Sequence, residues 1–66
     1  MTLETAIQLA AQEAQAFKVK VLVVESPHKE GIRFFPCRQD WWEGFGHNHT
    51  LRAEAHPNGK VHKTGR

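Results

Sequence analysis

The chain has 66 residues, one cysteine and a formal charge of +2, from nine lysines and arginines against seven aspartates and glutamates. A chain this short forms one domain with one small core, which leaves little apolar material for a deep enzyme pocket. A single cysteine excludes an internal disulfide, and no apolar run is long enough to span a membrane.

The N-terminal stretch is amphipathic and rich in polar residues, without the apolar central region of a signal peptide. The lone cysteine fits a reducing compartment. We therefore expect a cytoplasmic protein.

Residues 2–17 carry the clearest pattern in the chain. Thr2 suits the N-cap of a helix, and Glu4 places a negative charge where the helix dipole favours it. A lone helix of this length is marginal in water, so it must pack on the rest of the chain, with Ile7 near the centre of that contact. Spacings of three and four define its apolar stripe: Leu3, Ala6, Ile7, Ala10, Ala14 and Phe17.

Two strands are predicted next, over residues 18–25 and 31–38. The first is rich in β-branched residues and places Val19, Val21 and Val23 on one face. In the second, Pro36 lacks the N–H that a ladder needs, so this strand lies at an edge or turns Pro36 away from its neighbour.

Residues 39–49 have no clean period and predict either a short strand through Trp41 and Trp42 or a wide loop. Residues 50–56 alternate again, with Leu51, Ala53 and Ala55 on one face. They form a strand that pairs with a last one over residues 60–63.

The turn of that hairpin is predicted from its composition. Pro57 suits the second position of a type I turn, and Gly59 suits the left-handed position that follows Asn58. This three-residue loop pairs Ala55 with Val61 and Glu54 with His62. The fold class is therefore α+β, with one N-terminal amphipathic helix packed on a three- to four-stranded antiparallel sheet.

Catalytic and metal-binding sets are weak. His47 and His49 stand two residues apart and would share a face on a strand, which makes them the candidate ligands of a zinc site. No paired ligand motif accompanies them, and Cys37, beside Phe34 and Phe35, is typical of a buried hydrophobe. We expect no enzyme activity, no metal site and no cofactor.

The large aromatic residues Trp41, Trp42 and Phe45 are the most informative cluster. We expect one tryptophan to be buried against the second sheet face and the other to be at least partly exposed, as an anchor for a protein partner. The basic residues of the C-terminal third suggest an alternative, a nucleic-acid surface made of Arg52, Lys60, Lys63 and Arg66.

Over nearly its whole length, the sequence resembles PepSY-type domains, in which a helix precedes a small antiparallel sheet. The matching residues are few and are common in helix-plus-hairpin folds: Thr2, Glu4, Ala6, Ala10 and the turn over residues 58–61. The resemblance implies a restraint on peptidases, although the Trp41–Phe45 stretch departs from the pattern.

We therefore expect a small non-catalytic module that binds another protein, as an inhibitor or adaptor. A homodimer would also give so short a chain more core. Nucleic-acid binding through the basic hairpin is the alternative function.

Overall fold

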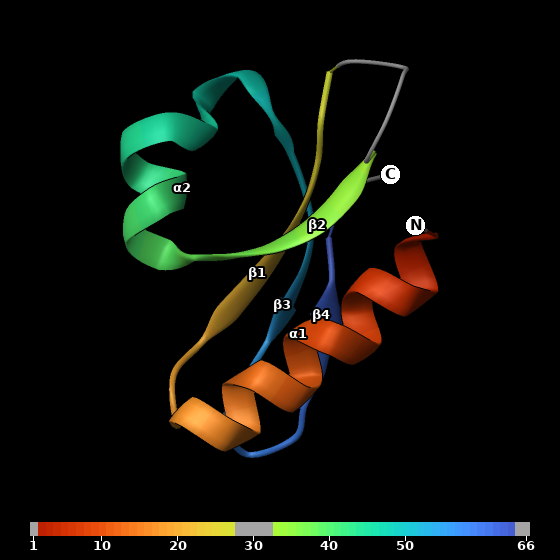
Figure 1. Cartoon of the computed structure of the whole chain (residues 1–66), viewed down its shortest axis with the longest axis vertical. Helices are drawn as coiled ribbons and strands as arrows, with labels where there is room; N and C mark the ends of the chain where they lie inside the picture. Colours follow the sequence, from red (N-terminus) through yellow and green to blue (C-terminus); the bar gives the residue numbers. More distant parts are fainter. Residues whose placement is uncertain (1, 28–32, 65–66) are drawn as a thin grey trace.

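The computed structural model describes residues 2–27 and 33–64. Its four strands form one antiparallel sheet in the order β2-β1-β3-β4 (Figure 1). This confirms the predicted α+β class with an N-terminal helix on an antiparallel sheet. The elements in chain order are α1 (Leu3–Phe17), β1 (Val21–Glu25), β2 (Phe34–Arg38), α2 (Gln39–Phe45), the 3₁₀ helix η1 (Gly46–Asn48), β3 (Thr50–Ala55) and β4 (Val61–Lys63).

Helix α1 has the ends that its sequence predicts. The Thr2 hydroxyl oxygen accepts a hydrogen bond from the Thr5 backbone N–H at 3.2 Å, so Thr2 is the N-cap. Lys18 ends the helix in the left-handed conformation, with φ of 59°, and its N–H donates to the Ala14 carbonyl. The chain changes direction between Lys18 and Val21, which is why the first strand does not begin at residue 18 as predicted.

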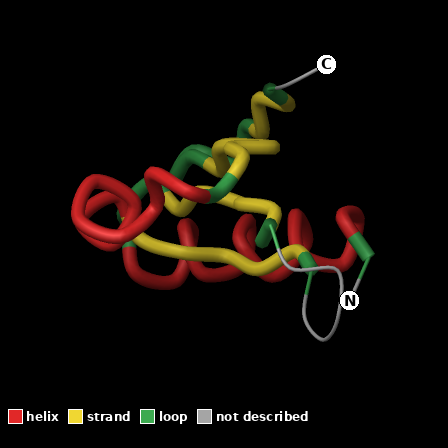
Figure 2. The backbone as a smooth tube through the Cα atoms, turned by 90° about the horizontal axis from the view of Figure 1, so that it is seen from above, coloured by secondary structure: helices red, strands yellow, loops and turns green. Residues whose placement is uncertain are grey.

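Helix α1 packs on the sheet through three alanines spaced four residues apart. Ala6, Ala10 and Ala14 are fully buried, and Figure 2 shows α1 running along one side of the strands. Their small side chains allow a close approach of helix to sheet, and the contact leaves no exposed area on them. The strand residues of the same buried cluster are also small: Val21, Val23, Ala53 and Ala55.

Two expectations about this helix are wrong. Ile7 is only partly buried and packs against the edge of the alanine cluster, so it is not the centre of the core. Phe17, expected in the buried stripe, is 59% exposed because the helix ends there, beyond the last buried alanine.

Strand β2 lies at one edge of the sheet and turns Pro36 outward. The Ser26 N–H donates to the Arg33 carbonyl at 2.7 Å, and hydrogen-bonded pairs alternate along an antiparallel ladder. Pro36, opposite Val23, therefore occupies a pair whose backbone groups point away from β1. Both alternatives predicted for Pro36 are therefore true: β2 is an edge strand, and Pro36 faces away from its neighbour. The predicted strand began at residue 31, and its first two residues lie outside the described residues.

A β-bulge separates the two ends of the β1–β3 pairing. Val23 faces Ala53, whereas the next residue, Val24, faces Leu51, so Arg52 is the extra residue on β3. The bulge moves Leu51 to the opposite face from Ala53 and Ala55. The expectation that all three share the buried face is therefore wrong for Leu51.

The C-terminal hairpin has the predicted three-residue loop. Ala55 pairs with Val61 and Glu54 with His62, and the His56 N–H donates to the Lys60 carbonyl at 2.8 Å. Gly59 has φ of 93°, as the left-handed position requires. No helix in the described residues has the length and apolar character to cross a bilayer.

Candidate protein-binding surface

The stretch after β2 forms a helix, α2, where a short strand or a wide loop was predicted. Hydrogen bonds within the first turns support it: the Gln39 amide donates to Glu43 at 3.1 Å, and the Asp40 carboxylate accepts from the Trp41 N–H at 2.9 Å. Gln39 and Glu43, like Trp41 and Phe45, are four residues apart and so lie on one side of a helical turn. This spacing was the available signal for the helix.

Gly46 fixes how α2 ends. A Cβ atom at this position would lie 2.3 Å from a carbon of the Trp42 ring, closer than real contacts permit. Only glycine allows the backbone to pass this ring, so the position of the Trp42 ring requires a glycine at residue 46. The N–H of Gly46 donates to the Trp42 carbonyl at the same point.

The alternation of the strands places α2 on the face of the sheet opposite α1. Leu22, Val24 and Phe35 point to this face, and the Phe35 ring meets Trp41 edge-on with centroids 5.5 Å apart. His49 packs against the same two rings, 5.2 Å from Trp41. Trp41 therefore covers the second face of the sheet, as expected for one of the two tryptophans.

The three aromatic residues predicted to bind a partner all lie on α2, and together they are here called the aromatic surface (Trp41, Trp42 and Phe45). Phe45 is 67% exposed, and its ring lies 6.1 Å from that of Trp41. Both tryptophans are only partly buried, which corrects the expectation that one of them would be buried. Helix α2 is too short to shield so many large rings from water.

An apolar groove adjoins the aromatic surface, between β2 and α2. Its volume is about 360 Å³, and the residues that line it are Phe35, Pro36, Cys37, Arg38 and Trp41. Burial, with a smaller contribution from the nearby Asp40 carboxylate, raises the pKa of the Cys37 thiol to about 11. Cys37 is therefore protonated at neutral pH and contributes apolar surface rather than a nucleophile.

The two candidate zinc ligands are not arranged as a pair. His47 is exposed on η1, whereas His49 follows η1 and packs against the Trp41 and Phe35 rings. Neither lies on a strand, so the expected shared face does not exist. Among the described residues, no three side chains of His, Cys, Asp and Glu gather in an arrangement that could hold a metal ion.

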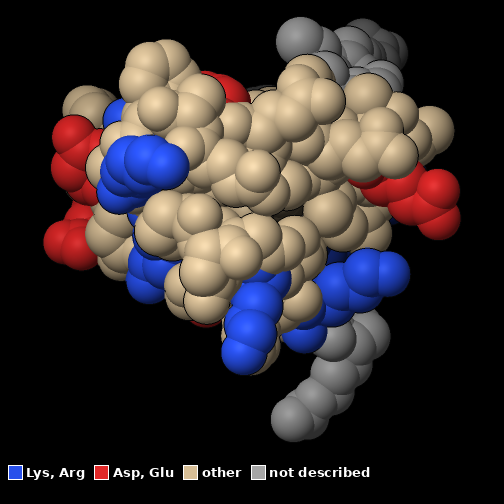
Figure 3. All heavy atoms as spheres, turned by 90° about the horizontal axis from the view of Figure 1, so that it is seen from below, with Lys and Arg blue, Asp and Glu red and all other residues tan. Residues whose placement is uncertain are grey.

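The basic candidates are dispersed. Lys60 and Lys63 are exposed, but the register places Lys60 opposite His56 and Lys63 opposite Ala53, on different faces of the hairpin. Figure 3 shows lysines and arginines spread over one side of the molecule, with acidic groups at its margins. Arg66 lies outside the described residues.

Arg52, the fourth basic candidate, is held in an ion pair. Its guanidinium lies 2.6 Å from Glu25 Oε1, while the Arg33 Nε donates to Glu25 Oε2 at 2.8 Å. The hydrogen bond from Arg33, followed by that from Arg52, lowers the pKa of the Glu25 carboxyl below its ordinary value of 4.5. Arg52 is therefore engaged within the fold, at the bulge that brings it to Glu25.

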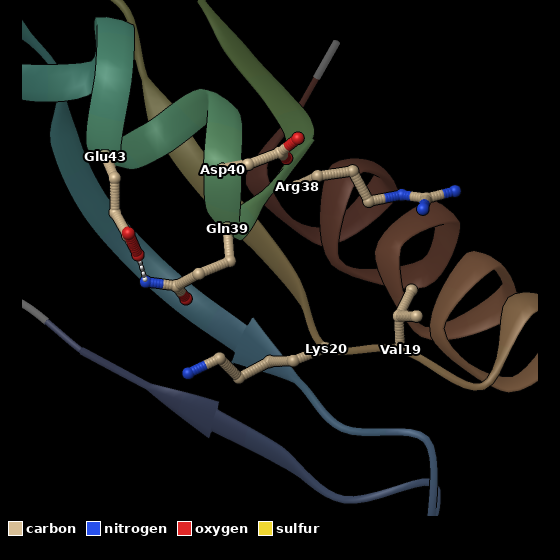
Figure 4. Close-up of a pocket in the computed structure, with 6 residues that line it drawn as sticks. All are labelled: Val19, Lys20, Arg38, Gln39, Asp40 and Glu43. Carbon is tan, nitrogen blue, oxygen red and sulfur yellow. Dashed lines mark hydrogen bonds between the residues drawn. The ribbon is translucent and has the colours of Figure 1, made fainter.

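A second hollow lies beside the start of α2, with Val19 and Lys20 on one wall and Asp40 and Glu43 on the other. Figure 4 shows Gln39 bonded to Glu43 beneath α2, and Arg38 extending away from both toward α1. Lys20 is 3.5 Å from Glu54 of β3. Acidic and basic groups alternate here, so the hollow favours neither sign of charge.

No protein-family model, no curated protein and no solved structure matches this chain. The resemblance to PepSY-type domains therefore stays a prediction.

Sequence reasoning missed the groove and the position of Arg38 beside it. The guanidinium carbon of Arg38 lies 4.9 Å from the centroid of the Phe17 ring. The two residues are far apart in the sequence, and neither belongs to a motif. Only the packing of α1 against the end of β2 brings them together.

Proposed function

We propose that this protein is a small non-catalytic module that binds another protein through the aromatic surface, as an inhibitor or adaptor. One observation carries the proposal. The fully buried core consists of alanines, valines and Leu22, whereas every phenylalanine and tryptophan keeps part of its side chain exposed, Phe45 most of all.

The energetic cost of this arrangement supports a binding role. Burying a phenylalanine side chain stabilises a fold by about 1.5–3 kcal/mol. A domain of this size has only about 5 kcal/mol of stability in total. Leaving Phe45 largely in water, beside two tryptophans that are only partly exposed, forgoes a large share of the available stabilisation. Tryptophan is enriched among the residues that dominate protein interfaces.

The structure gives less support to the nucleic-acid alternative. Arg52 is bound to Glu25, and Lys60 and Lys63 lie on different faces, so the three candidate cations among the described residues do not form one free patch. Phosphate binding needs several free cations along one path. We retain the cytoplasm as the proposed location, because the lone Cys37 fits a reducing compartment.

Capture from an extract of the source cells tests the proposal with Phe45→Ala as the main variant. Phe45 is largely exposed, so its truncation should leave the melting temperature nearly unchanged and abolish most of the captured partner. Leu9→Ala is the matched control, since Leu9 is a partly exposed apolar residue on α1, on the other side of the sheet. Equal capture by wild type and Phe45→Ala would reject the aromatic surface as the binding site.

A second copy of the chain is one partner that this surface can accept. Sedimentation velocity over a range of protein concentrations detects it directly. A dimer that Phe45→Ala converts to monomer would identify the partner as the protein itself. A dimer that is unchanged in the variant would place self-association elsewhere.

A further inference from the structure

Arg38 has an unusual position for a surface cation. It ends β2, its side chain is exposed, and its guanidinium stacks over Phe17 of α1. Figure 4 shows the side chain extending away from Asp40 and Glu43. None of the ion pairs among the described residues includes Arg38. Its stacking on the ring holds the guanidinium in place while leaving its N–H edge free.

The groove next to Arg38 is otherwise apolar. Phe35, Pro36, Cys37 and Trp41 provide its other walls, and protonated Cys37 adds no charge. A volume of about 360 Å³ is at the lower end of small-molecule sites, which suits one large side chain. Because Pro36 has no N–H to offer at this edge, a partner cannot bind mainly through a backbone ladder.

We propose that the groove receives an apolar or aromatic side chain of the partner protein and that Arg38 binds a carboxylate adjacent to it. This inference rests on the proposed function and specifies the chemistry of the partner. Arginine presents a planar fork that matches a carboxylate with two hydrogen bonds. An acidic-aromatic segment therefore satisfies both the apolar walls and the Arg38 guanidinium at their rim.

Small probes that carry these two groups test the inference without knowledge of the partner. Hydrocinnamate joins a phenyl ring to a carboxylate, and hydrocinnamamide and phenylpropylamine replace the carboxylate with a neutral or a positive group. Titration of labelled protein by NMR should shift the amides of Phe35, Cys37 and Arg38 and the indole N–H of Trp41. Hydrocinnamate should bind about threefold or more tightly than the amide, the range expected for an exposed charge pair, and the amine should bind most weakly.

Variants separate the two parts of the site. Arg38→Gln should remove the preference for hydrocinnamate and leave the affinity for hydrocinnamamide unchanged. Lys63 is an exposed cation on β4, and Lys63→Gln should change neither the preference nor the affinity. Equal binding of the three probes to wild type, or an absence of shifts at the groove, would overturn the inference. Tighter binding of adenosine monophosphate than of hydrocinnamate would also overturn it, in favour of a nucleic-acid ligand.

The two proposals fail in different ways. If capture depends on Phe45 but the probes show no charge preference, the module binds a partner of other chemistry. If hydrocinnamate binds as expected but Phe45→Ala captures as well as wild type, the groove accepts carboxylates and the aromatic surface is not the partner site.

Discussion

The two sides of the sheet are packed in opposite ways. On one side, α1 presents small side chains, and Ala6, Ala10 and Ala14 are completely removed from water. On the other side, α2 presents its largest side chains, and none of its residues is buried. The α1 side gains stability because helix and sheet pack closely, and the α2 side leaves apolar area exposed. Within one small domain, the helix that supports the fold and the helix that carries the candidate site are therefore distinct.

The buried polar atoms without a hydrogen-bond partner also distinguish the two sides of the sheet. Of the described residues, two have a buried side-chain atom without a hydrogen-bond partner, Gln39 Oε1 and His49 Nδ1. Gln39 begins α2, and His49 packs against the α2 ring of Trp41. Buried polar atoms are normally satisfied, so the α2 side is the less optimised one for folding.

Overpacking the α1 contact should produce the largest effect. Ala10→Leu places three extra carbons where the helix meets Val21 and Val23, and we expect a loss of about 3 kcal/mol. Ile7→Ala, at the edge of the same contact, should cost less, about 1–2 kcal/mol, because the site is only partly buried. Thermal melts measure both. A larger loss for Ile7→Ala than for Ala10→Leu would contradict the alanine contact as the centre of the core.

The reactivity of Cys37 measures how closed the groove on the α2 side is. A pKa of about 11, against an ordinary 9.0, leaves about 100-fold less thiolate near pH 8. The thiolate of a higher-pKa thiol is more nucleophilic, which offsets part of this difference, so we expect reaction with a disulfide reagent to be about tenfold slower in the folded protein than in guanidinium chloride. Similar rates in the two states would mean that the groove opens readily in solution.

A pair of glycine substitutions tests the geometry of α2. Gly46→Ala forces a Cβ onto the Trp42 ring and should cost about 2 kcal/mol, with a change in tryptophan fluorescence. Gly44 has no atom near the position of its missing Cβ, so Gly44→Ala should stabilise the protein by about 0.5–1 kcal/mol through helix propensity. Shifts of the same sign in the two variants would show that α2 does not end against Trp42.

Neutralising Glu25 should produce the smallest change, and this change should depend on pH. Because the folded pKa lies below the ordinary 4.5, the pair with Arg33 and Arg52 stabilises the fold above that value. This contribution is lost as the pH falls through the folded pKa. Glu25→Gln should therefore lower the melting temperature at pH 7 by less than Gly46→Ala does, and the difference should vanish in acid. Glu13→Gln is the control, and a pH-independent effect at Glu25 would exclude the ion pairs as its cause.

The parts of the fold that the sequence predicted correctly depend on local rules. The Thr2 cap, the helix over residues 2–17 and the turn with Gly59 at its left-handed position each follow from a few adjacent residues. The errors arose where distant segments decide the outcome. The bulge that moves Leu51 to the other face depends on pairing with β1, and no local pattern encodes it.

For the candidate site, the composition identified the cluster but not its form. Trp41, Trp42 and Phe45 were predicted to contact a partner, although the helix that arranges them was not predicted. The two glycines within residues 39–49 obscured the spacings of four that indicate that helix. Arg38 and Phe17 meet only through tertiary packing, so no reading of their neighbours in the sequence would join them.

The outward-facing Pro36 also limits how copies of this sheet can join. At the opposite edge, the His56–Lys60 and Thr64–Arg52 hydrogen bonds alternate so that Val61 and Lys63 direct their backbone groups outward. One edge of the sheet thus accepts a strand, and the other lacks a donor in its middle. A growing fibril needs two compatible edges on every subunit, whereas this sheet has one. Contact between copies along their sheets would therefore join two β4 strands around a two-fold axis and stop at a pair.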